Sequence, residues 1–284
     1  MKKVLITGCN GQLGRALNEL LRDSDVEIIN TDVAELDICN LDQVRRLLTE
    51  KRPDTIINCA AHTAVDKCET DAENAQKING LGPKNLATAA KEIDAQMVQV
   101  STDYVFSGDA DTPYTEEDAP CPQSVYGSTK LEGEQAVTSI LDRYYIVRTA
   151  WLYGDGNNFV KTMLRLAETR DKITVVNDQY GSPTSAMELA RMILHIVDSG
   201  EYGIYHGTCE GIASWYEFAC KIFALAGVDI NVVPVTTEEY PASVAKRPAY
   251  SVLENKKLNS QGSYRMKQWE DALEEYMESG ISNG

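Results

Sequence analysis

Tyr126 and Lys130 are the residues of this sequence best placed for acid–base chemistry. They lie four positions apart in Tyr126-Gly127-Ser128-Thr129-Lys130, inside a segment expected to be helical. Side chains at i and i+4 share one face of a helix, so both can reach one ligand. An ammonium ~6 Å from a phenol, at an effective dielectric near 20, stabilises the phenolate by about 3 kcal/mol. That is roughly two pKa units, which predicts that Tyr126 serves as a general acid tuned by Lys130.

A glycine-punctuated turn supplies a second functional pattern. Gly8, Gly11 and Gly14 follow the apolar run Val4–Thr7 and open a helix near Gln12 and Leu13. Small residues let the backbone approach a pyrophosphate, and the helix points its free amides and positive dipole end at it. A strand before the turn and a helix after it are the context that this pattern needs. The turn therefore predicts a dinucleotide site.

Acidic residues follow the second predicted strand. Asp32 stands 18 residues after Gly14, where a carboxylate can accept hydrogen bonds from the adenosine ribose and would repel a 2′-phosphate. The segment Asp32–Cys39 contains no Lys or Arg, so a modest preference for NADH over NADPH is expected. Asp37 and Ile38 are placed to contact the adenine ring. Turn or helix capping by these two aspartates is the alternative.

Polar residues also follow the third and fourth predicted strands. Thr102 could hydrogen-bond a substrate carbonyl, and Asp103 and Tyr104 could hold sugar hydroxyls, because ligands bind beyond the carboxyl ends of parallel strands. A Ser/Thr turn is the alternative for this segment. After the third strand, Ala60 and Ala61 allow close approach of a cofactor. His62 and Thr63 come next, and His62 is interpreted as a neutral hydrogen-bonding group rather than a catalytic acid.

The elements that position these residues alternate regularly. Strands are expected at 4–7, 26–30, 54–58 and 96–100, with helices between them and a bend near Gly80–Pro83 in a helix over 72–93. This order predicts an α/β fold with a doubly wound parallel sheet of Rossmann type. Further helices are expected at 124–140, 159–170, 185–197, 215–226 and 269–277, with a strand at 144–147. We expect residues 1–150 mainly to form the dinucleotide-binding domain. Residues 151–284 should mainly form a smaller α+β substrate lobe, with some segments returning to the first domain.

Composition excludes several classes of function. The formal net charge is −16, which disfavours nucleic acid as a partner and requires a local basic pocket for any anionic substrate. Seven cysteines, an odd number with no CxxC spacing, argue against a disulfide framework or a structural zinc site. No signal peptide or run of membrane-spanning length is visible. The cytoplasm is the expected compartment.

The motifs together resemble a known family. Its segments here are Ala61-His62-Thr63-Ala64-Val65-Asp66-Lys67, Ser101-Thr102-Asp103-Tyr104-Val105-Phe106, Tyr126-Gly127-x-x-Lys130-Leu131-x-Gly133-Glu134 and Asn177-Asp178-Gln179-Tyr180-Gly181-Ser182-Pro183-Thr184. With the glycine spacing and Asn58-Cys59-Ala60-Ala61, they resemble the extended short-chain dehydrogenase/reductase superfamily. Within it they closely resemble the dTDP-4-dehydrorhamnose reductases, over essentially the whole chain. That family reduces the C4 ketone of dTDP-4-dehydro-L-rhamnose with NADH or NADPH.

The resemblance implies a role for each matching residue. It makes Thr102, Tyr126 and Lys130 the catalytic set. It places around the cofactor Gly11, Gln12, Leu13, Asp32, Asp37, Ile38, Ala61, His62 and Thr63. The turn and the small residues after the third strand add Gly8, Gly14 and Ala60 to this set. The resemblance places at the substrate Val65, Asp103, Tyr104 and Trp151, whose indole could stack on a pyrimidine. Charge and donor type add Asn158, Lys161 and Arg247 as candidates for the diphosphate.

One position departs from the family pattern. Some relatives hold magnesium between subunits through carboxylates, often with a glutamate in the first helix, where this chain has Ala16. Glu188 alone would make a poor magnesium site. We therefore expect no metal, and either a monomer or a homodimer.

Two other interpretations share this fold. Sugar-nucleotide dehydratases usually carry Asp-Glu after the threonine, whereas this chain has Asp103-Tyr104, which favours reduction. An epimerase or another sugar-nucleotide reductase belongs to the same group of alternatives. A non-catalytic regulatory subunit, of the type that partners methionine adenosyltransferase, could keep the cofactor domain. The presence of Thr102, Tyr126 and Lys130 favours an enzyme.

Overall fold

A parallel sheet forms the centre of the protein. The computed structural model describes residues 1–240 and 243–279, and within them the main sheet has six strands in the order β10-β5-β4-β3-β1-β2, all parallel. The strands are β1 Lys3–Thr7, β2 Glu27–Thr31, β3 Thr55–Asn58, β4 Gln96–Thr102, β5 Tyr144–Thr149 and β10 Gly203–His206. Strand order reverses between β1 and β3, so their carboxyl ends open the crevice in which such sheets bind ligands.

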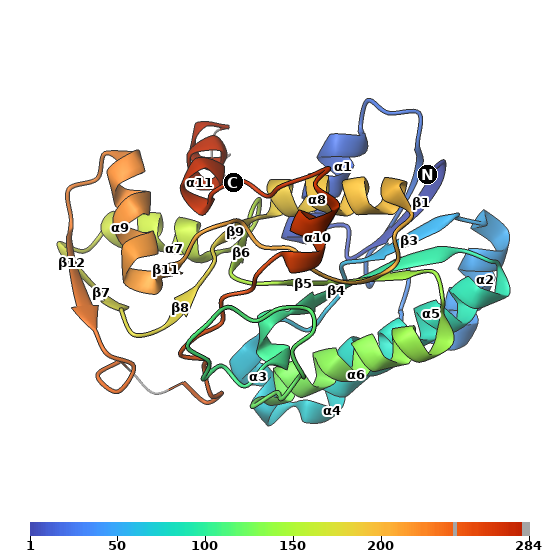
Figure 1. The fold of residues 1–284 in the computed structure, drawn as a ribbon, viewed down its shortest axis with the longest axis horizontal. Coiled ribbons are helices and arrows are strands. Elements are labelled where there is room, and N and C mark those ends of the chain that lie inside the picture. The colour runs from blue at the N-terminus through green and yellow to red at the C-terminus, as the bar shows by residue number, and fades with distance from the viewer. Residues whose placement is uncertain (241–242, 280–284) are drawn as a thin grey trace.

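Helices cover both faces of this sheet (Figure 1). On one face, α1 Gln12–Leu21 and α8 Ala186–Ser199 pack together over a core that includes Val4, Ile6 and Leu189. On the other face lie α2 Leu41–Lys51, α5 Gly82–Glu92 and α6 Val125–Ile140. The expected doubly wound α/β fold of Rossmann type is confirmed.

The long helix expected over 72–93 is divided. It consists of α4 Ala72–Gln76, a π-helical turn Lys77–Leu81, and α5, which has Pro83 in its first turn. The helical backbone continues through Leu81 and Gly82, and the π-helical turn lies where Pro83 removes a backbone donor from the helix. A short helix that the pattern did not indicate, α3 Val65–Thr70, precedes this segment. The bend brings the π-helical turn against α6.

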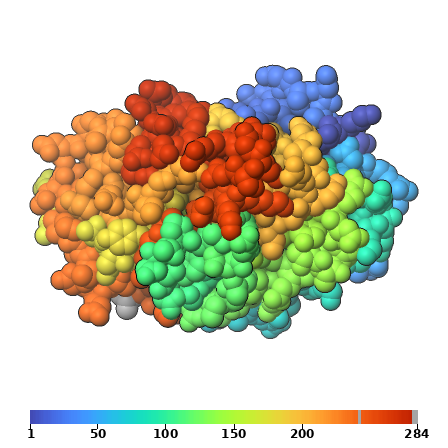
Figure 2. Space-filling view, viewed as in Figure 1, coloured from blue at the N-terminus to red at the C-terminus, as the bar shows by residue number. Residues whose placement is uncertain are grey.

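The later part of the chain builds a second core. It contains α7 Phe159–Ala167, α9 Trp215–Ala226 and α11 Trp269–Glu278, packed beside the parallel pair β7 Lys172–Val176 and β12 Asn231–Val235. Two small pairs complete it: β6 Leu152–Tyr153 with β9 Thr184–Ser185, and β8 Tyr180–Gly181 with β11 Ala213–Ser214. The strand β10 belongs instead to the main sheet, and α8 and α10 Lys256–Gln261 pack on the core of that sheet. Figure 2 shows the carboxy-terminal segment, in red, lying across the front of the molecule.

Candidate active site

One large cleft runs from the glycine turn to the second core. Its volume is about 1220 Å³, and the carboxyl ends of β1, β2, β3 and β4 form one wall. The predicted site residues that line it are Gly8, Gly11, Gln12, Leu13, Gly14, Asp32, Asp37, Ile38, Ala60, Ala61, Thr63, Val65, Thr102, Asp103, Tyr104, Tyr126, Lys130, Trp151 and Arg247. Residues drawn from the whole length of the chain therefore meet in one place.

The glycine turn is shaped to hold a dinucleotide. Gly8 has φ +63°, and a Cβ there would lie 2.7 Å from the backbone nitrogen of Ala60, so the turn packs against the end of β3. Gly11 caps α1 without a side-chain hydrogen bond to the first amides. Those amides remain available to an anion at the positive end of the helix dipole. The residues present thus fit a pyrophosphate.

Asp32 lies at the rim of this part of the cleft. Its Oδ1 accepts a hydrogen bond from the Val33 amide at 2.8 Å, and its Oδ2 accepts one from the Asn10 amide at 3.2 Å. These bonds fix the carboxylate at the carboxyl end of β2, the position from which it can accept ribose hydroxyls. The same two hydrogen bonds make Asp32 a cap for the neighbouring turns, which was the alternative interpretation. Capping and ribose binding are therefore compatible for this carboxylate.

Helix α6 sets Tyr126 and Lys130 against the end of β4. Ser124 caps the helix by accepting from the Gly127 amide at 3.1 Å. A Cβ on Gly127 would lie 2.1 Å from the Tyr104 carbonyl oxygen, so only glycine allows this close packing. The rings of Tyr104 and Tyr126 meet edge to face with centroids 5.4 Å apart. Thr102, Tyr126 and Lys130 are all buried, at 5%, 9% and 3% exposure.

Burial dominates the ionisation of this group. The pKa of Tyr126 is raised, first by desolvation, although a hydrogen bond with Thr102 acts in the opposite direction. The predicted lowering of this pKa by Lys130 is therefore wrong. The Coulomb attraction between ammonium and phenolate does not include the cost of removing the phenolate from water. The Lys130 ammonium is also directed elsewhere, because its Nζ donates to the Val100 carbonyl at 2.7 Å. Burial lowers the pKa of Lys130 to about 8, and the nearby carboxylate of Glu134 opposes that shift.

Asp103 has an unusual environment for a carboxylate. The Thr102 hydroxyl donates to its Oδ1 at 2.8 Å, while its buried Oδ2 has no hydrogen-bond partner among the described residues. Burial raises the pKa of Asp103 to about 6. Buried polar atoms are rarely left unpaired, so an unpartnered oxygen in a cleft wall indicates a place for a ligand donor.

Aromatic residues form the wall on the side of the second core. Trp151 has φ +48° and stacks on Trp215, with centroids 3.5 Å apart and ring planes 8° from parallel. Phe159 lies beside Trp215 at 4.7 Å, and all three line the cleft. Trp215 and Phe159 were missed from sequence. They open helices α9 and α7, and nothing in their spacing separates them from ordinary core residues.

Arg247 supplies a basic group in an otherwise acidic chain. Its guanidinium donates to the Tyr104 hydroxyl at 3.1 Å and to Asp66 Oδ2 at 2.8 Å, while Nε donates to Ser243 at 3.1 Å. Asp66 and Ser243 also line the cleft. These contacts hold the segment near Ser243 against α3, beside Tyr104.

Three predicted residues do not line the cleft. The His62 amide donates to the Asn79 side chain, and the His62 carbonyl accepts from it. The imidazole Nδ1 of His62 lies 3.4 Å from Cys68 Sγ, so this residue lies behind the cleft wall and supports it. Asn158 caps α7 by accepting from the Lys161 amide at 3.0 Å. The Lys161 ammonium pairs with Asp155 at 3.4 Å. The structure thus brings neither Asn158 nor Lys161 to the site, because capping and ion pairing engage both.

Glu188, the remaining candidate metal ligand, is held by groups of its own chain. It pairs with Arg191 at 3.1 Å and accepts from the Tyr264 hydroxyl at 2.8 Å and the Lys267 amide at 3.2 Å. In the described part of the chain, no three His, Cys, Asp or Glu residues cluster as metal ligands would. Nor does that part contain a helix long and apolar enough to cross a membrane.

A glycine turn and a Tyr-x-x-x-Lys pair in one cleft of a doubly wound sheet define a nicotinamide-dependent oxidoreductase. The comparisons with known proteins agree. The pattern of the RmlD substrate binding domain matches residues 1–281, and the chain belongs to this family. The spore coat polysaccharide biosynthesis protein SpsK of Bacillus subtilis is 42% identical over 283 residues, which cover 99% of each chain.

Two solved structures are similar throughout. A dTDP-4-dehydrorhamnose reductase from Clostridium acetobutylicum is 55% identical, with a TM-score of 0.96, covering 98% of this chain and 99% of that one. A dTDP-4-dehydrorhamnose reductase from Bacillus anthracis, in complex with NADP, is 45% identical, also with a TM-score of 0.96. That match covers 98% of this chain and 100% of the other. The resemblance inferred from the motifs is confirmed.

Proposed function

We propose that this protein reduces the C4 keto group of a nucleotide-diphospho-sugar with NADH or NADPH, most specifically dTDP-4-dehydro-L-rhamnose to dTDP-L-rhamnose. The observation that carries the proposal is the meeting of Thr102, Tyr126 and Lys130 with the glycine turn in one cleft. The names of the related proteins support the choice of sugar.

In this reaction the chain positions a ketone and supplies a proton. A bound nicotinamide cofactor supplies the hydride to C4. The raised pKa of Tyr126 keeps its phenol protonated at neutral pH, ready to donate as negative charge develops on the carbonyl oxygen. Thr102 can turn its hydroxyl from Asp103 to the same oxygen. The C=O bond becomes C–OH, and the phenolate regains its proton from solvent.

Lys130 and Asp103 orient the two reactants. With one N–H given to Val100, the Lys130 ammonium has two donors left for the nicotinamide ribose. The unpartnered oxygen of Asp103 can accept from a sugar hydroxyl. Arg247 is a candidate for the diphosphate, and the wall of Trp151 and Trp215 for the base. We assign cofactor binding mainly to residues 1–150 and substrate binding mainly to residues 151–284.

The compartment and assembly belong to the same proposal. All seven cysteines are free, which suits the reducing cytoplasm. The enzyme would work as a monomer or homodimer, without nucleic acid or a membrane as a partner.

The test is turnover with a defined product. Purified protein, dTDP-4-dehydro-L-rhamnose and NADPH or NADH should give loss of cofactor absorbance and one product, identified as dTDP-L-rhamnose by NMR. Cofactor labelled with deuterium at the transferred position should place deuterium on C4. Release of water from the sugar would instead indicate a dehydratase. Tight cofactor binding with no turnover of keto sugars would support the regulatory-subunit alternative.

A further inference from the structure

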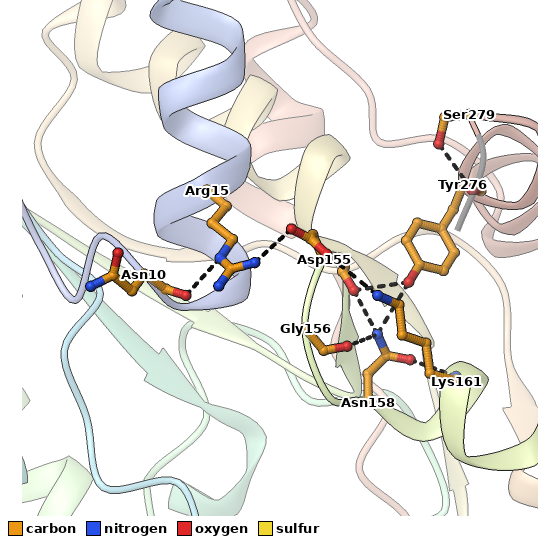
Figure 3. Close-up of polar contacts among 9 residues, drawn as sticks. Asn10, Arg15, Asp155, Gly156, Asn158, Lys161, Tyr276 and Ser279 are labelled. Atoms are coloured by element: carbon orange, nitrogen blue, oxygen red, sulfur yellow. Dashed lines mark hydrogen bonds and ion pairs between the residues drawn. The ribbon is translucent and has the colours of Figure 1, made fainter. Parts of the chain in front are cut away.

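Arg15 occupies the rim of the cofactor end of the cleft. It follows Gly14 directly, in the second turn of α1, and it lines the cleft. Its side chain is half exposed, at 50%. Its Nε donates to the Asn10 carbonyl at 2.8 Å, and its Nη1 pairs with Asp155 Oδ2 at 2.7 Å, as Figure 3 shows.

Arg15 and Asp32 are fixed to the same residue. The Asn10 carbonyl accepts from Arg15, while the Asn10 amide donates to Asp32 Oδ2 at 3.2 Å. The guanidinium and the carboxylate expected to bind the adenosine ribose thus both contact Asn10 and line the same end of the cleft. Loop 32–39 contributes no cation of its own, so Arg15 is the positive group that α1 brings to this rim.

The present partner of Arg15 is replaceable. Asp155 comes from the loop between β6 and α7, is about half exposed at 49%, and has a second cation, Lys161, at 3.4 Å. Hydrogen bonding from Arg15, and then from Lys161, lowers the pKa of Asp155. If Arg15 turns away, Lys161 still compensates the carboxylate (Figure 3). An exposed pair of this kind contributes little stability, so breaking it costs little.

We propose that Arg15 binds the 2′-phosphate of NADPH and leaves Asp155 to Lys161 when it does so. This rests on the cofactor site in the proposed function and adds the group that admits a phosphorylated ribose. A guanidinium can bind phosphate through two parallel N–H bonds, a geometry that a lysine cannot reproduce. Asp32 and Arg15 then act in opposition: the carboxylate favours the free 2′-hydroxyl and the guanidinium favours the phosphate.

The experiment is calorimetric titration of the whole protein in the absence of sugar substrate. Two ligands carry the 2′-phosphate, NADPH and 2′-phospho-ADP-ribose, and two lack it, NADH and ADP-ribose. Arg15→Gln should weaken binding of the phosphorylated ligands by about 10-fold or more, as for loss of a charged hydrogen-bonded pair, and change the others by less than about 2-fold. Arg22→Gln, on the exposed end of the same helix, is the control for net charge.

Asp155 provides an independent arm. Asp155→Asn removes the competitor and should strengthen binding of 2′-phospho-ADP-ribose by about 3-fold, within the range of an exposed ion pair. The same substitution in Arg15→Gln should have no effect on that ligand. Equal losses for all ligands in Arg15→Gln would assign Arg15 to the pyrophosphate, and an unchanged NADPH affinity would also refute the proposal. Wild-type protein that binds neither cofactor would remove the proposed function as well.

Discussion

The two ends of the cleft use charge in different ways. At the inner end, Thr102, Asp103, Tyr126 and Lys130 are at most 9% exposed, and desolvation is the largest cause of the pKa shifts of the last three. At the outer rim, Arg15 and Asp155 are half exposed and form an ion pair. The inner end thus controls protonation by excluding water. The rim discriminates between ligands by their charge, and because it is exposed to solvent, salt screens these interactions.

This difference predicts how substitutions will behave. A change at the inner end removes or exposes a group whose ionisation depends on burial, so its effects on rate or stability should be large. A change at the rim alters an exposed charge, so its effects should be modest and should weaken with salt. Four predictions test the contrast, beginning with the largest effect at the inner end and finishing at the rim.

The largest effect belongs to Tyr126→Phe. This change removes the proton donor and keeps the ring against Tyr104, so the fold and cofactor affinity should persist. Turnover should fall by about 10²–10⁴-fold, the usual contribution of a positioned acid. Steady-state kinetics with the keto sugar, paired with NADH titration, measure both quantities. Near-normal kcat at the pH optimum would assign the proton to another group.

The second prediction concerns stability at Asp103. Its pKa of about 6 lies above the ordinary value of 3.8, so between those values the folded protein holds a proton that the unfolded chain has lost. Stability must therefore fall as pH rises through that window, and the deficit stays constant above it. The deficit at pH 7 is at most about 3 kcal/mol for this shift.

Asp103→Asn should remove that penalty while keeping an acceptor for Thr102. The variant should unfold at a higher urea concentration at pH 7 and lose part of the decline in stability between pH 4 and pH 6. Its KM for the sugar should rise, because the free carboxylate oxygen is gone. Asp25→Asn, on the exposed surface, is the matched control. An Asp103 variant less stable than wild type at pH 7 would contradict a carboxylate whose desolvation outweighs its hydrogen bonds.

Lys130 gives the third prediction. Lys130→Met keeps the buried volume but removes the charge, so it should weaken NADH binding by about 10-fold, within the range for a charged hydrogen bond, and also reduce kcat. With a pKa of about 8, the wild-type ammonium is present below that pH and lost above it. NADH affinity of the wild type should therefore fall as pH rises past 8, and the variant should show no such dependence. A pH dependence shared by both proteins would belong to another group.

The sequence predicts the rigid parts of the site better than its electrostatics. The strand–turn–helix at Gly8–Gly14 and the Tyr126–Lys130 pair each depend on local spacing, and the structure has both in the expected elements and in the same cleft. The direction of the Tyr126 pKa shift was predicted wrongly, because the shift depends on how many apolar atoms from distant segments surround the phenol. Spacing along one helix carries no information about that burial.

Contacts between distant segments were the other limit. Asn158 and Lys161 have the right chemistry for a diphosphate, but neither lines the cleft, because a helix cap engages Asn158 and an ion pair with Asp155 engages Lys161. Strands β7 and β12 pair with each other across more than fifty residues, and their short apolar runs resemble loop or core segments. The sequence did not indicate Arg15, because the loop 32–39 contains no cation and α1 supplies this one from the other side of the turn.

The last prediction concerns Asp32, which measures the rim directly. At ~5 Å and an effective dielectric near 40, each unit of charge on a 2′-phosphate costs roughly 1.7 kcal/mol beside this carboxylate. That is a factor of about 15 for each unit of charge, before any compensation. Arg15 offsets part of it, so we expect only a small NADH preference in the wild type. Asp32→Ala should move the ratio of kcat/KM values toward NADPH, by less at high salt than at low salt, since the rim is screened.

Combining Asp32→Ala with Arg15→Gln should return the ratio toward the wild-type value, because the two opposed charges are then both absent. A wild type that strongly prefers NADPH, or an Asp32→Ala ratio that does not move, would show that the carboxylate does not discriminate between the cofactors. A shift unaffected by salt would show that the rim is more deeply buried in the complex than in the free protein, and the contrast between the two ends of the cleft would then fail.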